Sequence, residues 1–375
     1  MIVHWGDAAL RPRFPAPHAS GPMTPKRPIR AVAMLSGGLD STLATVLVQR
    51  QGVEVVGVNF STGFCRADHK RQVRRPDTDV KKLRNEALRT GAEFEVPVHV
   101  IDIAAEYLDV LRHPRHGYGR NANPCIDCRA MMMGRAREFM EEIDADFVFT
   151  GEVLGQRPKS QTRRAMNIVA EESGLGDRLV RPLSARMLAP TLPEREGWLD
   201  RELLLDLTGR DRNPQLRLAR EWGLDEVPQP AGGCCVLTDE GYSQRVFDLF
   251  AHGRREDLDH GDLLLCKVGR HFRLSANAKL VVARFDDENR FLETWHDGRP
   301  ILRARDHLGP VAVLDVAPGA ADDPFDLERA AGIVARYSKG KHADRVAVAV
   351  ERGDTITTLD VRPFAPVEVE AWMLR

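Results

Sequence analysis

The chain has 375 residues, 43% of them hydrophobic and 29% charged, which is typical of a globular protein with about two domains. The 54 Lys and Arg residues are balanced by 55 Asp and Glu residues, and this excludes a polycation of the histone type. No apolar run approaches the ~18 residues of a membrane span, no signal-peptide core is present, and six cysteines are too few for a disulfide scaffold. We therefore expect a cytoplasmic protein with no membrane partner.

The first 29 residues contain six prolines and no periodic apolar pattern, so we expect residues 1–29 to be a disordered, basic, Pro-rich tail. Order begins at residues 31–35, an apolar run of strand length. A helix over 41–51 and a second buried strand over 53–60 follow, and together they predict a βαβ unit.

The alternation continues with a helix over 80–90 that Gly91 ends, a strand over 94–101 and a helix over 104–112. A loop over 121–128 leads into a helix over 130–143 and a strand over 146–150. This order predicts an open parallel sheet with helices on both faces. Because ligands lie outside the carboxyl ends of such strands, the residues after Leu35, Phe60 and Thr150 are the informative ones.

The pattern changes in the last third of the chain. Helices are predicted over 198–207 and 215–222, and Pro228 and Pro230 mark a break. Short β-type runs follow at 263–268, 279–283, 345–350 and 355–361. We therefore predict two domains after the tail, an α/β domain over 30–240 and a smaller α+β domain over 241–375.

A glycine turn at residues 36–41 separates the first strand from the first helix. Gly37 and Gly38 let the backbone approach a ligand, and the helix opened by Ser41 offers free N–H groups to phosphate. The turn lacks the Lys of the G-x-x-x-x-G-K-[ST] loop, which argues against cleavage between the β and γ phosphates. We expect Asp40 to act through Mg²⁺. The alternative is a tight turn capped by Ser or Asp.

The sequence Ser-Gly-Gly-Leu-Asp-Ser resembles the S-G-G-x-D-S signature of the PP-loop ATP pyrophosphatases, which implies cleavage of ATP to AMP and pyrophosphate. Residues 150–156 (T-G-E-V-L-G-Q), 160–162 (S-Q-T) and 181–183 (R-P-L) are similar to the tRNA 4-thiouridine synthetases. The resemblance covers about residues 30–240. The expected ATP-binding residues are Ser36, Gly37, Gly38, Asp40, Ser41, Phe60, Gly151 and Gln156.

The chain departs from that family in two respects. Only the tail precedes the glycine turn, where a ferredoxin-like and THUMP region is expected, and no rhodanese pattern follows. RNA capture and sulfur supply therefore need other residues.

Two groups of cysteines are candidates for sulfur chemistry. Cys125 and Cys128 form a C-x-x-C pair just before a predicted helix, whose dipole favours thiolate; the alternative is two incidental loop cysteines. Cys234 and Cys235 follow a Gly-rich loop, and we expect one of them to join the pair. We predict that these cysteines and Asp40 are the catalytic residues.

Three thiolates, Cys125, Cys128 and Cys234 with Cys235 as the alternative, would leave one iron of a 4Fe-4S cluster open to hold sulfide. This set resembles the iron-sulfur-dependent tRNA thiolases. The competing hypothesis is a cysteine persulfide that a second cysteine resolves. The sulfur donor is expected to be sulfide or a cysteine desulfurase.

Two basic segments are candidates for RNA binding. Residues 66–84 carry eight Lys or Arg residues, and a second cluster lies around Phe272, which could stack on a base. The predicted contacts are Lys70, Arg71, Arg74, Arg75, Lys267, Arg270 and Arg273. The second segment resembles the NFACT RNA-binding domain. The alternative for both is a solvated charged face.

These features predict an ATP-dependent tRNA sulfurtransferase that adenylates a uridine carbonyl and replaces its oxygen with sulfur. We favour 4-thiouridine synthesis. The alternatives are a tRNA 2-thiouridylase that uses a cysteine persulfide, an amide-forming ligase, and a non-catalytic RNA-binding protein. A homodimer is left open.

Overall fold

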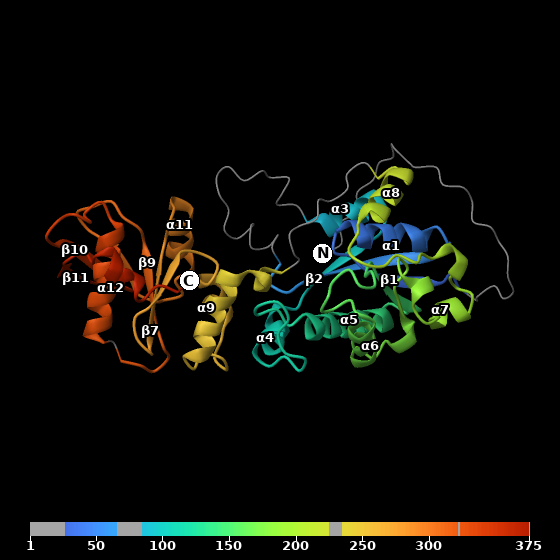
Figure 1. Cartoon of the computed structure of the whole chain (residues 1–375), viewed down its shortest axis with the longest axis horizontal. Helices are drawn as coiled ribbons and strands as arrows, with labels where there is room; N and C mark the ends of the chain where they lie inside the picture. The colour runs from blue at the N-terminus through green and yellow to red at the C-terminus, as the bar shows by residue number, and fades with distance from the viewer. Residues whose placement is uncertain (1–26, 66–84, 225–234, 322, 375) are drawn as a thin grey trace. The chain divides into compact units, whose positions relative to one another are not determined.

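The computed structural model describes residues 27–65, 85–224, 235–321 and 323–374 (Figure 1). It divides into two compact units. The described parts of 1–65, 84–119 and 124–234 form unit 1, and residues 120–123 and 235–374 form unit 2. No helix within the described ranges is long and apolar enough to span a bilayer.

Unit 1 is built on a five-stranded parallel sheet, as the alternation of strands and helices predicted. The central strand β1 (Arg30–Met34) lies between β2 (Glu54–Ser61) and β4 (Phe147–Thr150). The strand order is β3-β2-β1-β4-β5, with β3 at Val98–Asp102 and β5 at Leu179–Val180.

Helices cover both faces of this sheet, because β1 alternates its buried side chains between two cores. Ala31 and Ala33 pack on one side with α1 (Leu39–Gln49) and α8 (Asn213–Glu221). Val32 packs on the other side with α5 (Cys125–Glu142), and α6 (Arg163–Glu172) closes that face (Figure 1). The other helices of unit 1 are α3 (Glu86–Glu93), α4 (Ala104–Arg112) and the short α7 (Leu192–Arg195).

Two predictions for unit 1 are wrong for reasons of tertiary packing. Gly91 does not end a helix, because α3 continues to Glu93. A Cβ on Gly91 would lie 2.4 Å from Val98 Cγ2, so this glycine allows α3 to approach β3. The predicted helix over 198–207 contains only a 3-10 turn at 201–203, since residues 205 and 207 donate backbone hydrogen bonds to the carbonyls of residues 182 and 183.

Unit 2 is an antiparallel six-stranded sheet in the order β11-β10-β8-β9-β7-β6. The strands are β6 (Arg270–Arg273), β7 (Ala278–Val282), β8 (Ile301–Ala304), β9 (Ala312–Val316), β10 (Val346–Arg352) and β11 (Thr355–Val361). One face packs on α12 (Pro324–Tyr337), and the other on α10 (His260–Leu265) and α11 (Asp286–Trp295). α9 (Glu240–Ala251) and α13 (Pro366–Glu370) complete the unit.

The strand predicted over 263–268 is wrong, because its first half belongs to helix α10. Asp259 and Asp262 form a reciprocal capping box at the start of this helix. Its apolar run is buried whichever conformation it adopts, so hydrophobicity alone could not separate helix from strand.

Candidate nucleotide and sulfur site

The glycine turn leaves β1 and enters α1 in a conformation that needs its glycines. Gly37 has a φ of +71°, and a Cβ there would lie 2.4 Å from the backbone of Glu86 at the start of α3. Gly38 is the N-cap of α1, so the first N–H groups of that helix have no acceptor within the helix. Ser36 Oγ and Ser41 Oγ lie 3.1 Å apart beside them. The turn therefore offers oriented donors to an anion, as predicted.

Two asparagines that the sequence analysis missed hold this turn in place. Asn59 at the end of β2 donates its amide to the carbonyl of Leu35 at 2.7 Å. Asn85 donates to Asn59 Oδ1 at 3.2 Å, and its own Oδ1 caps α3 by accepting from Ala87 N at 3.0 Å. The only signal in the sequence was the place of Asn59, one residue before the predicted end of a strand.

The end of β4 packs directly on the glycine turn. Met34 and Thr150 are neighbours in the parallel ladder, so the segment after Thr150 leaves the sheet beside the turn. A Cβ on Gly151 would lie 2.4 Å from Asp40 C and Ser41 N. The structure thus brings the predicted residues of the two motifs into contact.

Asp40 is the charged centre of this arrangement. Its Oδ2 accepts a hydrogen bond from Gln156 Nε2 at 3.0 Å, and Arg212 Nη2 lies 4.0 Å from the same oxygen. Asp40 Oδ1 and Gln156 Oε1 are buried and accept no hydrogen bond in the described part of the chain. Oxygen atoms of this kind beside a helix N-terminus fit a magnesium ion that carries phosphate.

Phe60 is placed differently from the other predicted ATP-binding residues. Its half-buried side chain packs against the core on the α5 and α6 face of the sheet. The backbone of Phe60, at the carboxyl end of β2, is the part of this residue that could contact a nucleotide. The role of Phe60 in ATP binding stays a prediction.

Glu152 is a buried carboxylate that joins three segments of unit 1. It is 4% exposed and pairs with Arg129 of α5 and with Arg181, whose Nε lies 3.0 Å from Glu152 Oε2. Arg181 also donates to the carbonyl of Met166 at 3.0 Å. Burial by itself raises the pKa of Glu152, but the two guanidinium groups outweigh it and hold the pKa below its usual value. These contacts give the Glu of T-G-E and the Arg of R-P-L a scaffold role.

Glu152→Gln is expected to destabilise the protein by about 1–3 kcal/mol, because the buried guanidinium of Arg181 and the half-buried one of Arg129 lose their counter-charge. Because the pKa of Glu152 is lower in the folded protein than in the unfolded chain, the ionised carboxylate stabilises the folded state. This stabilisation is fully present above the unfolded pKa and is lost as the pH falls through the folded pKa. Denaturant unfolding of both proteins between pH 7 and about pH 3 should show a steeper acid loss in the wild type below about pH 5. Equal slopes would contradict the paired state of Glu152.

The two cysteines of the C-x-x-C pair lie in the first turn of α5, not in a loop before it, because Pro124 is the N-cap and the helix begins at Cys125. Cys125 and Cys128 are half-buried and one turn apart. Arg129, the next residue, contacts Glu152 and so connects this turn to the segment after β4. The pair is therefore fixed to the same scaffold as the glycine turn.

The other candidates for sulfur chemistry are Cys234 and Cys235. Cys235 is half-buried in unit 2, and Cys234 lies outside the described residues. Within the described ranges, no three His, Cys, Asp or Glu side chains gather closely enough to hold a metal ion. Cys266 is buried in unit 2, and burial raises the pKa of its thiol, as befits a core residue.

Lys70, Arg71, Arg74 and Arg75 lie outside the described residues.

In unit 2, the prediction that Phe272 stacks on a base is wrong, because this ring is fully buried in the core. Lys267 is 7% exposed, and Arg273 Nε pairs with Asp248 Oδ1 at 3.1 Å. Arg270 is half-buried with its guanidinium 4.7 Å from the ring centre of Tyr337. The neighbouring His271 and Phe272 of β6 are both buried, because successive side chains point to opposite faces and both faces of this sheet are covered by helices.

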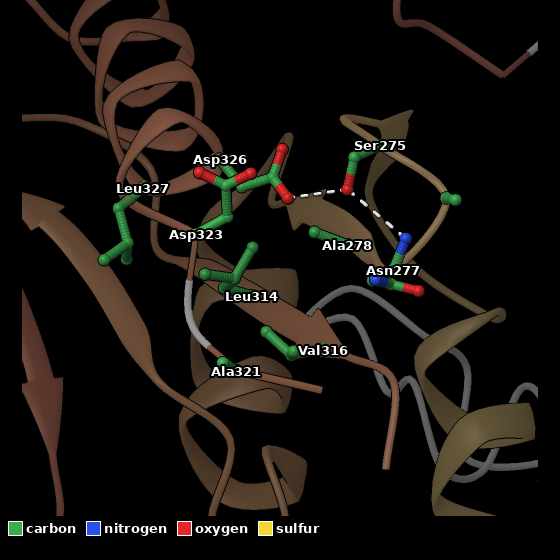
Figure 2. A pocket seen from close by; sticks show the side chains of 10 residues that line it. Ser275, Asn277, Ala278, Leu314, Val316, Ala321, Asp323, Asp326 and Leu327 are labelled. Carbon is green, nitrogen blue, oxygen red and sulfur yellow. Dashed lines mark hydrogen bonds between the residues drawn. The ribbon is translucent and has the colours of Figure 1, made fainter. Parts of the chain in front are cut away.

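Unit 2 contains a cavity of about 140 Å³ between the β6–β7 turn and the start of α12 (Figure 2). Its polar lining is already engaged: Ser275 Oγ donates to Asp326 Oδ2 at 2.6 Å, and Arg329 lies 3.2 Å from Asp326 Oδ1. Asp323 Oδ1 caps α12 by accepting from Phe325 N at 2.9 Å. These contacts fasten the hairpin to the helix.

The chain is similar to tRNA-modifying proteins. A 2-thiouridylase of Methylobacterium nodulans, "tRNA-specific 2-thiouridylase MnmA", is 24% identical over 70% of this chain and 70% of its own length. A "Probable tRNA sulfurtransferase" of Thermococcus kodakarensis is 29% identical over 53% of this chain and 44% of its own length. A solved 4-thiouridine synthetase–RNA complex with bound ATP has a TM-score of 0.36 and 22% identity over 56% of this chain and 45% of its own.

Two family models match separate parts of the chain. Residues 29–185 match the family described as "Thiamine biosynthesis protein (ThiI)", and residues 269–373 match the family described as "NFACT protein RNA binding domain". Unit 1 thus contains a region similar to the ThiI family, and unit 2 contains a region similar to the NFACT RNA-binding domain family.

Proposed function

We propose that this protein is an ATP-dependent tRNA sulfurtransferase that activates a uridine carbonyl by adenylation. The observation that carries the proposal is the Asp40 centre: a glycine turn at a helix N-terminus, with two unpartnered buried oxygen atoms on Asp40 and Gln156. The ThiI-family match over residues 29–185 and the thiouridylase and sulfurtransferase relatives support the same assignment.

The turn has the parts that an adenylation needs. Free N–H groups of α1 bind phosphate, and Asp40 with Gln156 would hold the Mg²⁺ that neutralises it. The uridine carbonyl oxygen attacks the α-phosphorus and pyrophosphate leaves. The adenylated oxygen is then a good leaving group, so a sulfur nucleophile can attack the same carbon and expel AMP.

Cys125 and Cys128 are the proposed source of that sulfur. The N-terminal turn of α5 favours negatively charged sulfur at both positions. In the persulfide route, a cysteine desulfurase first transfers a sulfur atom to one of the two cysteines as a persulfide, and the terminal sulfur of that persulfide attacks the adenylated carbon and expels AMP. The second thiolate then attacks the first cysteine, which leaves a thiocarbonyl and a disulfide that a reductant must reopen.

The other route uses a 4Fe-4S cluster with Cys234 or Cys235 as the third ligand. Cys125 and Cys128 would supply two of its three thiols from one helix turn. Such a cluster would hold sulfide at its open iron. Iron and sulfide analysis of anaerobically purified protein separates the two routes, since active protein without iron supports the persulfide.

Unit 2 is the proposed tRNA-binding part, on the basis of its NFACT family match. Arg270 remains the best placed of the predicted contacts, because its guanidinium is not paired with a carboxylate in the described structure. Lys267 and Arg273 are proposed to add positive charge to the tRNA-binding surface without contacting the tRNA directly.

Incubation of the full chain with ATP, Mg²⁺, unmodified tRNA and a sulfur donor, either sulfide or a cysteine desulfurase with cysteine, is expected to yield AMP and pyrophosphate together with a thiolated nucleoside. Chromatography of the nucleotides and mass spectrometry of digested tRNA measure the products. 4-Thiouridine is expected and 2-thiouridine is the alternative. Formation of ADP in place of AMP would contradict the proposal.

A further inference from the structure

Residues 113–119 form a loop of unit 1 that lies against the first turn of α5. Asp127, which stands between the two cysteines of the C-x-x-C pair, is 7% exposed. Its Oδ1 accepts a hydrogen bond from Arg115 N at 2.9 Å, and its Oδ2 accepts one from His116 N at 3.2 Å. Both donors are backbone groups, so these bonds fix the path of the loop and leave its side chains to other contacts.

Two further contacts hold the loop on other parts of unit 1. Lys159 Nζ, in the segment after β4, donates a hydrogen bond to the carbonyl of Tyr118 at 3.4 Å. His116 Nε2 lies 2.9 Å from Glu172 Oε1 at the end of α6. The loop is thereby fastened to α5, to α6 and to the segment after β4.

The loop and the segment after β4 form a basic surface. Residues 113–119 and 157–164 contain five Arg or Lys residues, no Asp and no Glu. All five are exposed: Arg115, Arg157, Lys159, Arg163 and Arg164. Within the described ranges, the side chains of Arg115 and Arg164 make no ion pair or hydrogen bond. Uncompensated positive charge of this kind attracts a polyanion.

The position of this basic surface favours RNA over a single nucleotide as the polyanion. Asp127, which holds the 113–119 loop, belongs to the helix turn that carries both thiols. Gln156, three residues before Lys159, donates to Asp40 at 3.0 Å, so the segment after β4 also reaches the glycine turn. One ATP would occupy the glycine turn, whereas positive charge on two further segments matches a longer chain of phosphates.

We propose that the basic surface binds the phosphate backbone of tRNA beside Cys125 and Cys128, and that Asp127 positions its 113–119 loop. This inference rests on the proposed function, because it names the part of unit 1 that brings the tRNA to the sulfur. Phosphate contacts from Arg and Lys position a nucleic acid without reading its sequence. The surface therefore holds the tRNA in register with the thiols whichever uridine is the target.

The first test measures binding of unmodified tRNA and of Mg-ATP to the full chain. Arg115→Gln and Arg164→Gln should each weaken tRNA binding about 3- to 10-fold and lower the salt dependence of log Kd by about one. Affinity for Mg-ATP should change less than about twofold, because ATP binds at the glycine turn. Fluorescence anisotropy at several salt concentrations and calorimetry measure the two affinities.

The matched control is Arg217→Gln. Arg217 is an exposed arginine of α8, which packs on the opposite face of the sheet from α5. This variant should bind tRNA and Mg-ATP as the wild type does.

The second test concerns the positioning role of Asp127. Asp127→Ala should release the loop and weaken tRNA binding about 3- to 10-fold while Mg-ATP binding persists. Asp127→Asn keeps one acceptor oxygen and should recover part of the loss. Arg115→Gln added to Asp127→Ala should cost nothing further, because Arg115 is already released. Additive losses in the double variant would overturn the role of Asp127.

The outcomes separate this inference from the proposed function. If the wild type binds no tRNA, or releases no pyrophosphate with tRNA and ATP, the proposed function fails as well. If the wild type does both, and Arg115→Gln and Arg164→Gln bind tRNA equally well, the surface is a solvated charged face and only this inference is overturned. Equal losses of tRNA and Mg-ATP affinity would mean that the arginines serve the nucleotide or the fold, and would also overturn it.

Discussion

Cys125→Ala is expected to abolish tRNA thiolation, with a loss of at least about 100-fold, while tRNA binding and the first round of pyrophosphate release persist. Both sulfur routes need this thiol, since it is either the persulfide carrier, the resolving thiolate or a cluster ligand. Adenylation uses the glycine turn and not the cysteine, so the variant should stop after one pyrophosphate per site. Alanine is a good residue for the first turn of α5, and folding should not suffer.

Rapid-quench measurement of pyrophosphate and mass spectrometry of the tRNA would show this separation of steps. Cys266→Ala is the control, because that thiol is buried in unit 2 and burial raises its pKa. It should cost about 1 kcal/mol of stability and leave thiolation intact. Full thiolation by Cys125→Ala would remove the cysteine mechanism.

Gly151→Ala is expected to destabilise the protein by about 1–3 kcal/mol and to weaken ATP binding at least tenfold, because overpacking forces the backbone to move. The added Cβ would lie 2.4 Å from Asp40 C and Ser41 N, which are backbone atoms of the first turn of α1. That turn carries both the donors for phosphate and the Asp40 carboxylate. Denaturant unfolding and ATP titration measure the two effects.

A second glycine of unit 1 provides the control. Gly134 lies within α5, and the atom nearest to an added Cβ is Ser173 O at 4.0 Å. Gly134→Ala should therefore stabilise the helix by about 0.5–1 kcal/mol and leave ATP binding unchanged. If Gly151→Ala and Gly134→Ala change stability and ATP binding by the same amounts, the close contact between Gly151 and α1 is not the cause of the predicted losses.

Much of unit 1 could be predicted from local patterns. Continuous apolar runs gave the buried strands β1, β2 and β4, and the glycines after β1 predicted the anion-binding turn. The helix over 104–112 was predicted with the bounds that the structure has. These features depend on neighbours in sequence, so the sequence carries them directly.

Other features required the path of the whole chain. Gly91 was expected to end a helix and Gly151 to bind ATP, but both also lie where a Cβ would clash with a distant backbone or side chain. The apolar run at 263–265 is helical because of a capping box, and Phe272 is buried because of the register of a hairpin. The periodicity of apolar residues in the sequence does not indicate which neighbour a buried side chain packs against.

The amino-acid sequence by itself was enough to predict a class of chemistry: a glycine turn after a buried strand, with one acid and no lysine, predicts a phosphate ligand that a magnesium ion accompanies. Tertiary structure alone decided that Arg129 and Arg181 support Glu152 and that Arg212 faces Asp40. The reason is physical. A turn is encoded by the torsional freedom of adjacent residues, whereas an ion pair between distant segments exists only after the sheet and its helices have packed.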